Sequence, residues 1–193
     1  MKNLTPGVAP ATVLLTGFDA FGGDAVNPSW LVAQALHGQT LQGHRVVAAQ
    51  LPTEFSASRK RLSALLREHQ PALVLSLGLA GGRASLSLER IAINVQDARI
   101  ADNIGAQPID VPVIKSGPAA YFSTLPIKAM LQALTAANIA AEVSQTAGTF
   151  VCNHVFLRAD ARLEKATRHS KSARRFCASA LSAKPGHAQH AIR

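Results

Sequence analysis

The feature that most constrains this chain is the alternation of short apolar runs with stretches whose apolar residues recur at helical spacing. Apolar runs cover residues 13–16, 45–51 and 73–77, and helical periodicity follows the first two. Strands that alternate with helices favour right-handed βαβ units and a mainly parallel sheet covered on both faces. We therefore predict a single-domain α/β fold with three layers, α/β/α, around a mainly parallel twisted sheet.

Local signals place the other elements. Asn27 followed by Pro28 is typical of an N-cap and a first helical residue, so we expect a helix to begin there. The remaining expected elements are helices over 58–69 and 123–138, strands over 88–95 and 142–145, and a long loop over 96–118.

The net charge of +9 is unevenly distributed along the chain. Residues 157–193 carry nine Lys or Arg and two Asp or Glu, a balance of +7, whereas the first 156 residues carry eleven and nine, a balance of +2. The apolar periodicity also fades from about Leu157 onward. We therefore divide the chain into an N-terminal extension (1–11), an α/β domain (12–156) and a divergent basic tail (157–193).

Several classes of protein find little support in the sequence. No apolar run reaches about 18 residues, so no membrane span is predicted. The N-terminus lacks an apolar segment followed by a small-residue cleavage site, and a cytoplasmic location is expected. Cys152 and Cys177 do not resemble a disulfide framework, and Cys152 with His154 lacks a second pair at metal-ligand spacing. We therefore expect no metal and no cofactor.

Candidate site residues follow predicted strands. The glycine-rich loops 17–23 and 78–82, together with Cys152, should meet at one edge of the sheet, where sites of such folds lie. Neither loop matches GxGxxG or GxxxxGK[ST], the nucleotide-binding patterns. Phe18 and Phe21 in the first loop either line a pocket for a small flat ligand or cap the core.

Cys152 is the candidate nucleophile, because it ends a short apolar run just before a predicted helix. Unpaired N–H groups and the helix dipole at such a position favour a thiolate and can stabilise an oxyanion. The alternative is a buried cysteine that acts as a small hydrophobic residue. Glu89 lies at the start of an apolar strand, either as a catalytic partner or in an ion pair with Arg83 or Arg90.

An ordered set of stretches between about residues 12 and 156 carries a family resemblance. They are Leu15–Gly23, Asn27–Ser29, Gly78–Arg83, Leu88–Asn94, Asp97–Ile100, Asp102–Asn103, Gln107–Asp110, Gly117–Pro126 and Thr146–His154. Together they resemble the pyroglutamyl peptidase I family of cysteine peptidases, also called pyrrolidone-carboxylate peptidases.

The resemblance implies hydrolytic removal of an N-terminal pyroglutamyl (5-oxoprolyl) residue from peptides through a Cys thiolate acyl-enzyme. Cys152 falls on the family's nucleophile and Glu89 on its acidic triad member. The residues that fall in regions surrounding the substrate ring are Phe18, Phe21, Ile100, Phe150 and Val151. The resemblance also implies a cytoplasmic homotetramer that needs no metal or cofactor.

The chain departs from the family at the catalytic histidine. That histidine follows the cysteine in a Gly-Phe-(Ile/Val)-His stretch, which is missing here. His154 does not fall on the family's base, His169 matches nothing, and His187 and His190 lie in the tail. Because losing a triad member commonly costs several orders of magnitude in rate, we expect little activity from this sequence. We also expect poor folding, because the tail replaces the family's last helix and strand and exposes apolar core faces.

A frameshift offers one explanation for these departures. Family members continue near Leu157 with a stretch such as Tyr-Ala-Leu-Met-His, and codons allowed for Leu157–Ala161 give that stretch when one nucleotide is dropped. In the same shifted frame, Arg174–Ala183 can read Gly-Gly-Phe-Val-His-Leu-Pro-Tyr-Leu-Pro. A one-nucleotide insertion near codon 157, real or a sequencing error, is therefore our hypothesis for the tail.

Two other functions remain open. One is a catalytically inactive relic that at most binds pyroglutamyl peptides. The other is an RNA-binding tail, which has little support because Phe176 is the tail's aromatic residue and no recognised motif occurs there. We expect small peptides as partners, and neither nucleic acid nor membrane.

Overall fold

The computed structural model describes the backbone of residues 11–169 and 176–182 and the side chains of residues 11–161. The strands are β1 (Thr12–Phe18), β2 (Thr40–Leu41), β3 (His44–Leu51), β4 (Leu73–Gly78), β5 (Leu86–Glu89), β6 (Ile91–Ile93), β7 (Ala120–Phe122), β8 (Ala141–Ser144) and β9 (Phe176–Ser182). The helices are α1 (Pro28–Ala35), α2 (Phe55–His69), α3 (Ile127–Ala136) and α4 (Val151–His169).

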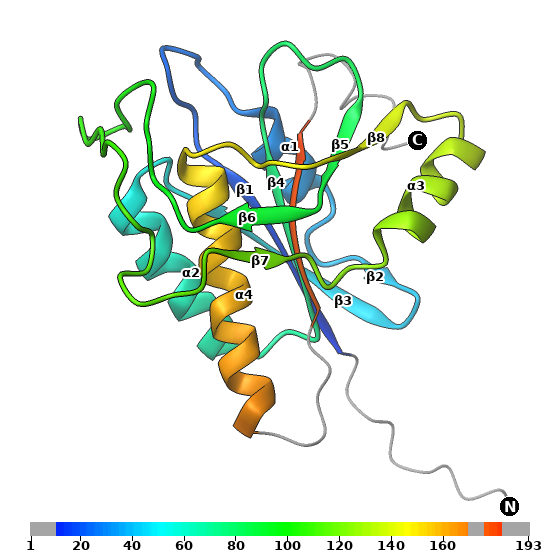
Figure 1. The fold of residues 1–193 in the computed structure, drawn as a ribbon. Helices are drawn as coiled ribbons and strands as arrows, with labels where there is room; N and C mark the ends of the chain where they lie inside the picture. The colour runs from blue at the N-terminus through cyan, green and yellow to red at the C-terminus, as the bar shows by residue number, and fades with distance from the viewer. Residues whose placement is uncertain (1–10, 170–175, 183–193) are drawn as a thin grey trace, which may run out of the picture.

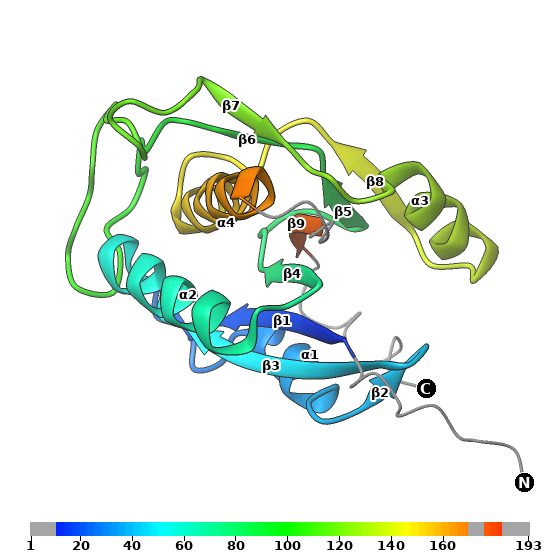
Figure 2. The same cartoon turned by 90° about the horizontal axis from the view of Figure 1, so that it is seen from below.

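Within these residues, the main sheet has seven strands in the order β2-β3-β1-β4-β9-β5-β8 (Figure 1). The β1–β3, β1–β4, β4–β9 and β5–β8 pairs are parallel, whereas β2–β3 and β5–β9 are antiparallel. Helix α1 lies on one face of the sheet, and α2 and α4 lie on the other (Figure 2). The predicted single-domain α/β fold with a mainly parallel sheet is confirmed.

The main core lies between the sheet and the pair of helices α2 and α4. Its largest fully buried side chains include Leu14 and Leu51 from the strands, Leu62 and Leu65 from α2, and Val155 from α4. The leucines of α2 recur at helical spacing, as the sequence pattern predicted, so one face of that helix is buried. Burial of these side chains fixes α4, and with it Cys152, against the sheet.

The start of α1 is locked to the end of β1, and Asn27 is its N-cap as predicted. The Asn27 Oδ1 accepts hydrogen bonds from the Ser29 N–H at 3.1 Å and the Ser29 hydroxyl at 2.8 Å. The Ser29 Oγ in turn accepts from the Phe18 N–H at 3.0 Å. A Cβ on Gly17 would lie 2.5 Å from the Ser29 carbonyl oxygen, so this close approach requires glycine.

Several predicted boundaries are wrong. The strand expected over 88–95 is divided at Arg90, because β5 pairs with β8 while β6 pairs with β7 in a separate two-stranded sheet. The Arg90 N–H donates to Ser144 and its carbonyl accepts from Ser123, which turns the chain from one sheet to the other. Helix α2 begins at Phe55 rather than at residue 58, and α3 begins at Ile127, after Pro126, rather than at residue 123.

Helix α4 continues through the expected boundary at residue 157. The consecutive side chains from Asn153 to Leu157 are buried, and so are Ala159, Asp160 and Ala161, so this part of the helix is enclosed on every side. Helices buried all round are normally apolar all round. Here Asp160 is only 5% exposed and Arg158 is partly buried, so charged groups occupy positions where the fold favours apolar ones.

Candidate active site

Cys152 is the second residue of α4, so the predicted position at a helix start is confirmed. A tight turn over residues 146–149 directly precedes this helix. The Gly148 N–H donates to the Thr146 Oγ1 at 3.0 Å, Gly148 has φ of +74°, and the Thr149 hydroxyl donates to the Asp97 carbonyl at 2.6 Å. The first N–H groups of α4 have no partner within the helix, so this end of the helix offers donors suited to a developing oxyanion.

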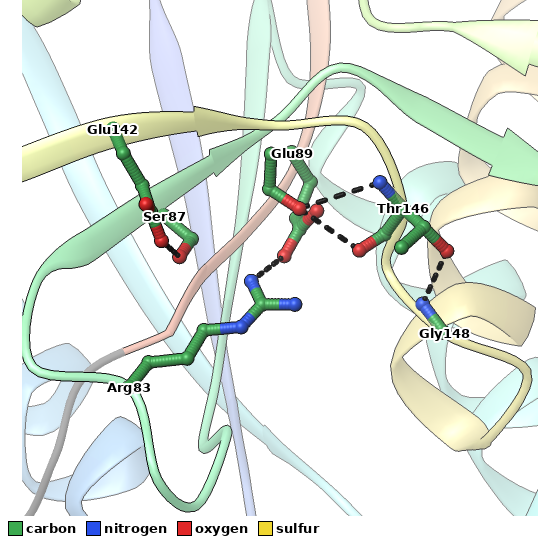
Figure 3. Close-up of polar contacts among 7 residues, drawn as sticks. Arg83, Ser87, Glu89, Glu142, Thr146 and Gly148 are labelled. Atoms are coloured by element: carbon green, nitrogen blue, oxygen red, sulfur yellow. Dashed lines mark hydrogen bonds and ion pairs between the residues drawn. The ribbon is translucent and has the colours of Figure 1, made fainter.

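Glu89 is the last residue of β5, and it is only 4% exposed. The Arg83 Nη1 lies 2.8 Å from its Oε1, as Figure 3 shows. Burial raises the pKa of Glu89, while a hydrogen bond from Ser144 and the charge of Arg83 act in the opposite direction. Of the two predicted ion pairs, the one with Arg83 is therefore present, and Arg83 compensates a carboxylate that burial would otherwise favour as the neutral acid.

The environment of Cys152 favours the neutral thiol. Burial and, to a smaller extent, the negative charge of Glu89 raise the pKa of Cys152 to about 12, while a backbone hydrogen bond acts in the opposite direction. A thiol with such a pKa carries almost no thiolate at neutral pH, so the nucleophile depends on a base that takes its proton. The position at the helix start does not replace that base.

His154 is not this base. Residues i and i+2 of a helix do not face each other, so His154 points away from Cys152. Its Nδ1 lies 2.8 Å from Gln96 Oε1, and its ring contacts Phe55 edge to face at 5.8 Å between centroids. Burial, together with the charges of Arg158 and Arg59, lowers the pKa of His154 to about 4, so the ring is neutral at pH 7.

His169 lies too far from Cys152 to act as its base. It ends α4, 17 residues after Cys152 in the same continuous helix, and a rise of 1.5 Å per residue separates the two backbones by about 26 Å. The other histidines with described side chains, His37, His44 and His69, bond to groups near themselves in the sequence or on β3. His187 and His190 lie outside the described residues.

Aromatic rings gather beside Cys152. The Phe21 and Phe150 centroids lie 6.1 Å apart, and Phe55 contacts Phe150 edge to face at 5.4 Å. Phe18 and Val151, at 3% and 0% exposed, belong to the core beneath these rings, whereas Phe21, Phe150 and Ile100 are half-buried. The predicted substrate-binding set therefore divides into a supporting core and an exposed wall.

Two residues of this region were missed by the sequence analysis in different ways. Phe55 belongs to the aromatic group, but it lies just outside the predicted helix, and no local pattern distinguished it. Asp102 was noticed only as part of a matching dipeptide, yet its carboxylate joins distant segments around the pocket. Its polar character within a loop of 96–118 was the one available signal.

Two further observations concern the described residues as a whole. Among them, no three His, Cys, Asp or Glu side chains cluster in a way that could hold a metal ion. No helix in this part of the chain has the length and apolar character needed to cross a membrane.

A mainly parallel α/β fold with a cysteine at a helix start and a buried glutamate nearby defines the class of α/β cysteine hydrolases. Comparison with known proteins specifies the family. The pyroglutamyl peptidase family model matches residues 11–175. The pyrrolidone-carboxylate peptidase of Bacillus cereus strain Q1 is 53% identical over 154 residues, covering 80% of this chain and 72% of the relative. That of Bacillus cytotoxicus is 57% identical over 145 residues, covering 75% and 67%.

Solved structures agree with this assignment. Pyroglutamyl peptidase I from Bacillus amyloliquefaciens superposes with a TM-score of 0.82 at 39% identity, covering 94% of this chain and 93% of the other. Pyrrolidone carboxyl peptidase from Thermococcus litoralis gives a TM-score of 0.80 at 34% identity, covering 87% and 74%. The chain belongs to the pyroglutamyl peptidase family, and the predicted family and type of enzyme are confirmed.

Proposed function

We propose that this fold is built to remove an N-terminal pyroglutamyl residue from peptides, with Cys152 as the nucleophile and Glu89 as the acidic member of its triad. The observation that carries the proposal is the placement of Cys152 at the start of α4, near the buried carboxylate of Glu89 and next to an aromatic wall. Family membership supports the same reaction.

The ring of a pyroglutamyl residue is small, flat and uncharged, because its amine is closed into a lactam. Phe21, Phe150 and Ile100 offer half-buried apolar surface that suits such a ring, with Phe18 and Val151 supporting them from the core. A free N-terminus would bring an ammonium group into this apolar wall at a large desolvation cost. Selectivity for the cyclised N-terminus follows from that difference.

The reaction divides into two steps. A base takes the Cys152 Sγ proton, the thiolate attacks the pyroglutamyl carbonyl carbon, and N–H groups at the start of α4 stabilise the oxyanion. The peptide amine leaves with a proton, and an acyl-enzyme remains on Sγ. Water then attacks the thioester carbonyl, which releases pyroglutamate and returns the thiol.

The base for these steps is the missing component. With the pKa of Cys152 raised to about 12 and neither His154 nor His169 placed to act, this sequence has a binding site and a nucleophile but no described histidine partner. Little turnover is therefore expected from this exact chain. A relic that binds pyroglutamyl peptides without hydrolysing them is the second candidate function, and the same observation favours it.

The frameshift hypothesis gains support from the packing of α4. Arg158 and Asp160 lie where a helix enclosed on every side favours apolar residues, and both follow the proposed insertion near codon 157. In the shifted frame, the histidine falls at codon 178. Ala178 lies on β9 opposite Leu75, and Leu181 of the same strand lies opposite Leu88, the neighbour of Glu89. A histidine at position 178 would therefore lie on β9, which pairs with β5, the strand that carries Glu89.

Nucleotide sequencing tests the frameshift directly. Codons over 157–183 that cannot give the family's stretches after loss of one nucleotide would rule it out. The division into a domain over 12–156 and a tail over 157–193 belongs to the same proposal. A cytoplasmic homotetramer also remains a proposal, based on the family resemblance, and size-exclusion chromatography with light scattering tests its oligomeric part.

Release of a fluorophore from an L-pyroglutamyl amide tests the proposed reaction, with Cys152→Ser as the control. Any turnover by this chain should disappear in the control, because the hydroxyl is a much weaker nucleophile in this environment. Turnover that survives the substitution would contradict the role of Cys152. A prolyl amide with the same fluorophore should not be cleaved, since its ring carries a charged amine.

A further inference from the structure

Besides the segment of Phe150, the residues proposed to surround the substrate ring come from three segments that are far apart in the sequence. Phe21 lies in the loop after β1, Phe55 begins α2, and Ile100 lies in the long loop between β6 and β7, which runs beside α2 (Figures 1 and 2). Contacts between the rings alone would not hold the backbones of these three segments in fixed positions relative to one another. A polar residue at the centre of the three segments does so.

That residue is Asp102, which is only 6% exposed. Its Oδ2 accepts a hydrogen bond from the Phe55 N–H at 3.0 Å, which caps α2 from outside the helix. Residue 54, the N-cap by position, makes no side-chain capping bond, so Asp102 takes that role in its place. The helix dipole favours a carboxylate at this end. One oxygen of Asp102 therefore fixes Phe55, whose ring packs against Phe150.

The other oxygen of Asp102 orders its own loop. Oδ1 accepts from the Ile104 N–H at 3.1 Å and from the Ala106 N–H at 2.8 Å, and the Asp102 N–H donates to the Ala106 carbonyl at 2.9 Å. Ala106 packs against the main core. Ile100 lies two residues before this closed turn, so the turn restrains the backbone that carries Ile100.

The neighbouring Asn103 extends the same connection to the third segment. Its Nδ2 donates to the Ala20 carbonyl at 2.9 Å and lies 3.3 Å from Asp19 Oδ1. Its backbone N–H donates to the Thr53 carbonyl at 3.1 Å, while the Thr53 N–H donates to Asp19 Oδ1 at 2.6 Å. The loop that carries Phe21 is thus bound to the residue next to Asp102.

We propose that Asp102 is a positioning residue for ring recognition, which assembles the pyroglutamyl pocket by holding its three wall segments in register. The proposal rests on the function proposed above, because the ligand is the pyroglutamyl ring. It adds that affinity for the ring depends on a carboxylate that does not touch the ring. The neutral amide of Asp102→Asn cannot replace it, since one oxygen cannot accept three N–H bonds and its NH₂ group faces a donor.

The experiment measures binding of L-pyroglutamyl amide by calorimetry to this chain, to Asp102→Asn and to Asp24→Asn. Asp24 is an exposed aspartate in the loop of Phe21, so it is a matched control for the loss of one charge. Binding needs no general base, so the missing histidine does not affect the readout. We expect Asp102→Asn to weaken binding about tenfold or more, the loss from one or two unmade charged hydrogen bonds, and Asp24→Asn to leave it unchanged.

Amide hydrogen exchange separates the possible outcomes. Protection of the Phe55, Ile104 and Ala106 amides should fall in Asp102→Asn while the α4 amides stay protected. Unchanged affinity despite lost protection would overturn the positioning role and leave the proposed function intact. Failure of the unaltered protein to bind the amide would contradict the proposed function and, with it, this proposal. If Asp102→Asn does not fold, Asn103→Ala removes the side-chain links to Ala20 and Asp19, and equal affinity in that variant would contradict the proposal.

Discussion

The pocket side of the molecule and the helix that carries the nucleophile differ in how well the residue types suit their positions. Around the pocket, the side chains of Asp19, Asn27, Asp102 and Asn103 each bind at least one backbone group of another segment. Along α4 beyond residue 157, charged side chains lie in a helix that is enclosed on every side. Arg158 donates a hydrogen bond to the Val113 carbonyl, but charged residues are unusual at such positions, so sequence and fold agree less well in the second region than in the first.

This difference teaches that recognition and chemistry are separable in this chain. The segments proposed to bind the ring all precede residue 157, and so do Cys152 and Glu89. The general base would have to come from later in the chain, where the agreement between sequence and fold is lost. Binding should therefore survive in a protein whose turnover is impaired, and the following predictions test that separation.

The largest expected effect concerns the reactivity of Cys152. With its pKa raised from 9.0 to about 12, the thiol should react with iodoacetamide at pH 7 about three orders of magnitude more slowly than an unperturbed cysteine. The rate should rise with pH throughout the range from 7 to 10. Mass spectrometry of the peptide that contains Cys152 gives its own rate, with free cysteine as the reference. A rate that levels off near pH 7 would indicate a base or cation beside the thiol.

The next effect is a loss of stability in acid through His154. Its pKa is about 4 in the folded protein and 6.5 as the ordinary value, so the unfolded chain takes up the proton first as the pH falls. The stabilisation is complete above pH 6.5 and is lost as the pH falls from there to 4, by roughly 3 kcal/mol. Urea unfolding at several pH values measures it. In His154→Gln, which cannot be protonated, this part of the pH dependence should be absent.

A smaller effect is expected at Arg83, the cation beside the buried Glu89. Arg83→Met should destabilise the fold by about 1–2 kcal/mol, a modest value because the arginine side chain is 31% exposed. Arg45→Met, at an exposed arginine of β3, is the matched control and should change stability by much less. The effect of Arg83→Met should shrink when Glu89 is also replaced by Gln, and equal losses in both backgrounds would argue against the ion pair.

The smallest effect concerns the cap of α1. Asn27→Ala removes the side-chain bonds to Ser29 and to the Asp19 carbonyl, and should cost about 1 kcal/mol in the free energy of unfolding. Gln34→Ala on the same helix, at an exposed position, should cost almost nothing. Thermal unfolding of both variants provides the comparison. Equal midpoints of thermal unfolding for the two variants would show that the Asn27 cap does not stabilise the start of α1.

Local sequence patterns were sufficient to predict those helices and strands that depend on neighbouring residues in the sequence. The Asn27–Pro28 pair marks the start of α1, and the apolar run at 73–77 marks a central strand. Cys152 at a helix start could also be predicted, because it ends a short apolar run just before a predicted helix. The family resemblance added Glu89 and the outline of the aromatic wall, which the residues alone left open.

Features that depend on distant partners could not be predicted in the same way. The division between β5 and β6 arises because Ser144 and Ser123 bind the backbone of Arg90, and no local signal marks it. Phe55 joins the pocket through Phe150, which is 95 residues away in the sequence. Asp102 caps a helix to which it is not connected in the chain. Each depends on tertiary contacts that a local pattern does not encode.

The most direct test of the central claim compares two proteins in the same assay. One is this chain, and the other is the protein translated after removal of one nucleotide near codon 157, which restores a histidine at codon 178. Release of a fluorophore from an L-pyroglutamyl amide should rise about a thousandfold or more in the second protein, the usual effect of regaining a triad member, while both bind pyroglutamyl amide. Equal turnover by the two proteins would contradict the account, because the chemistry would then not require the missing histidine.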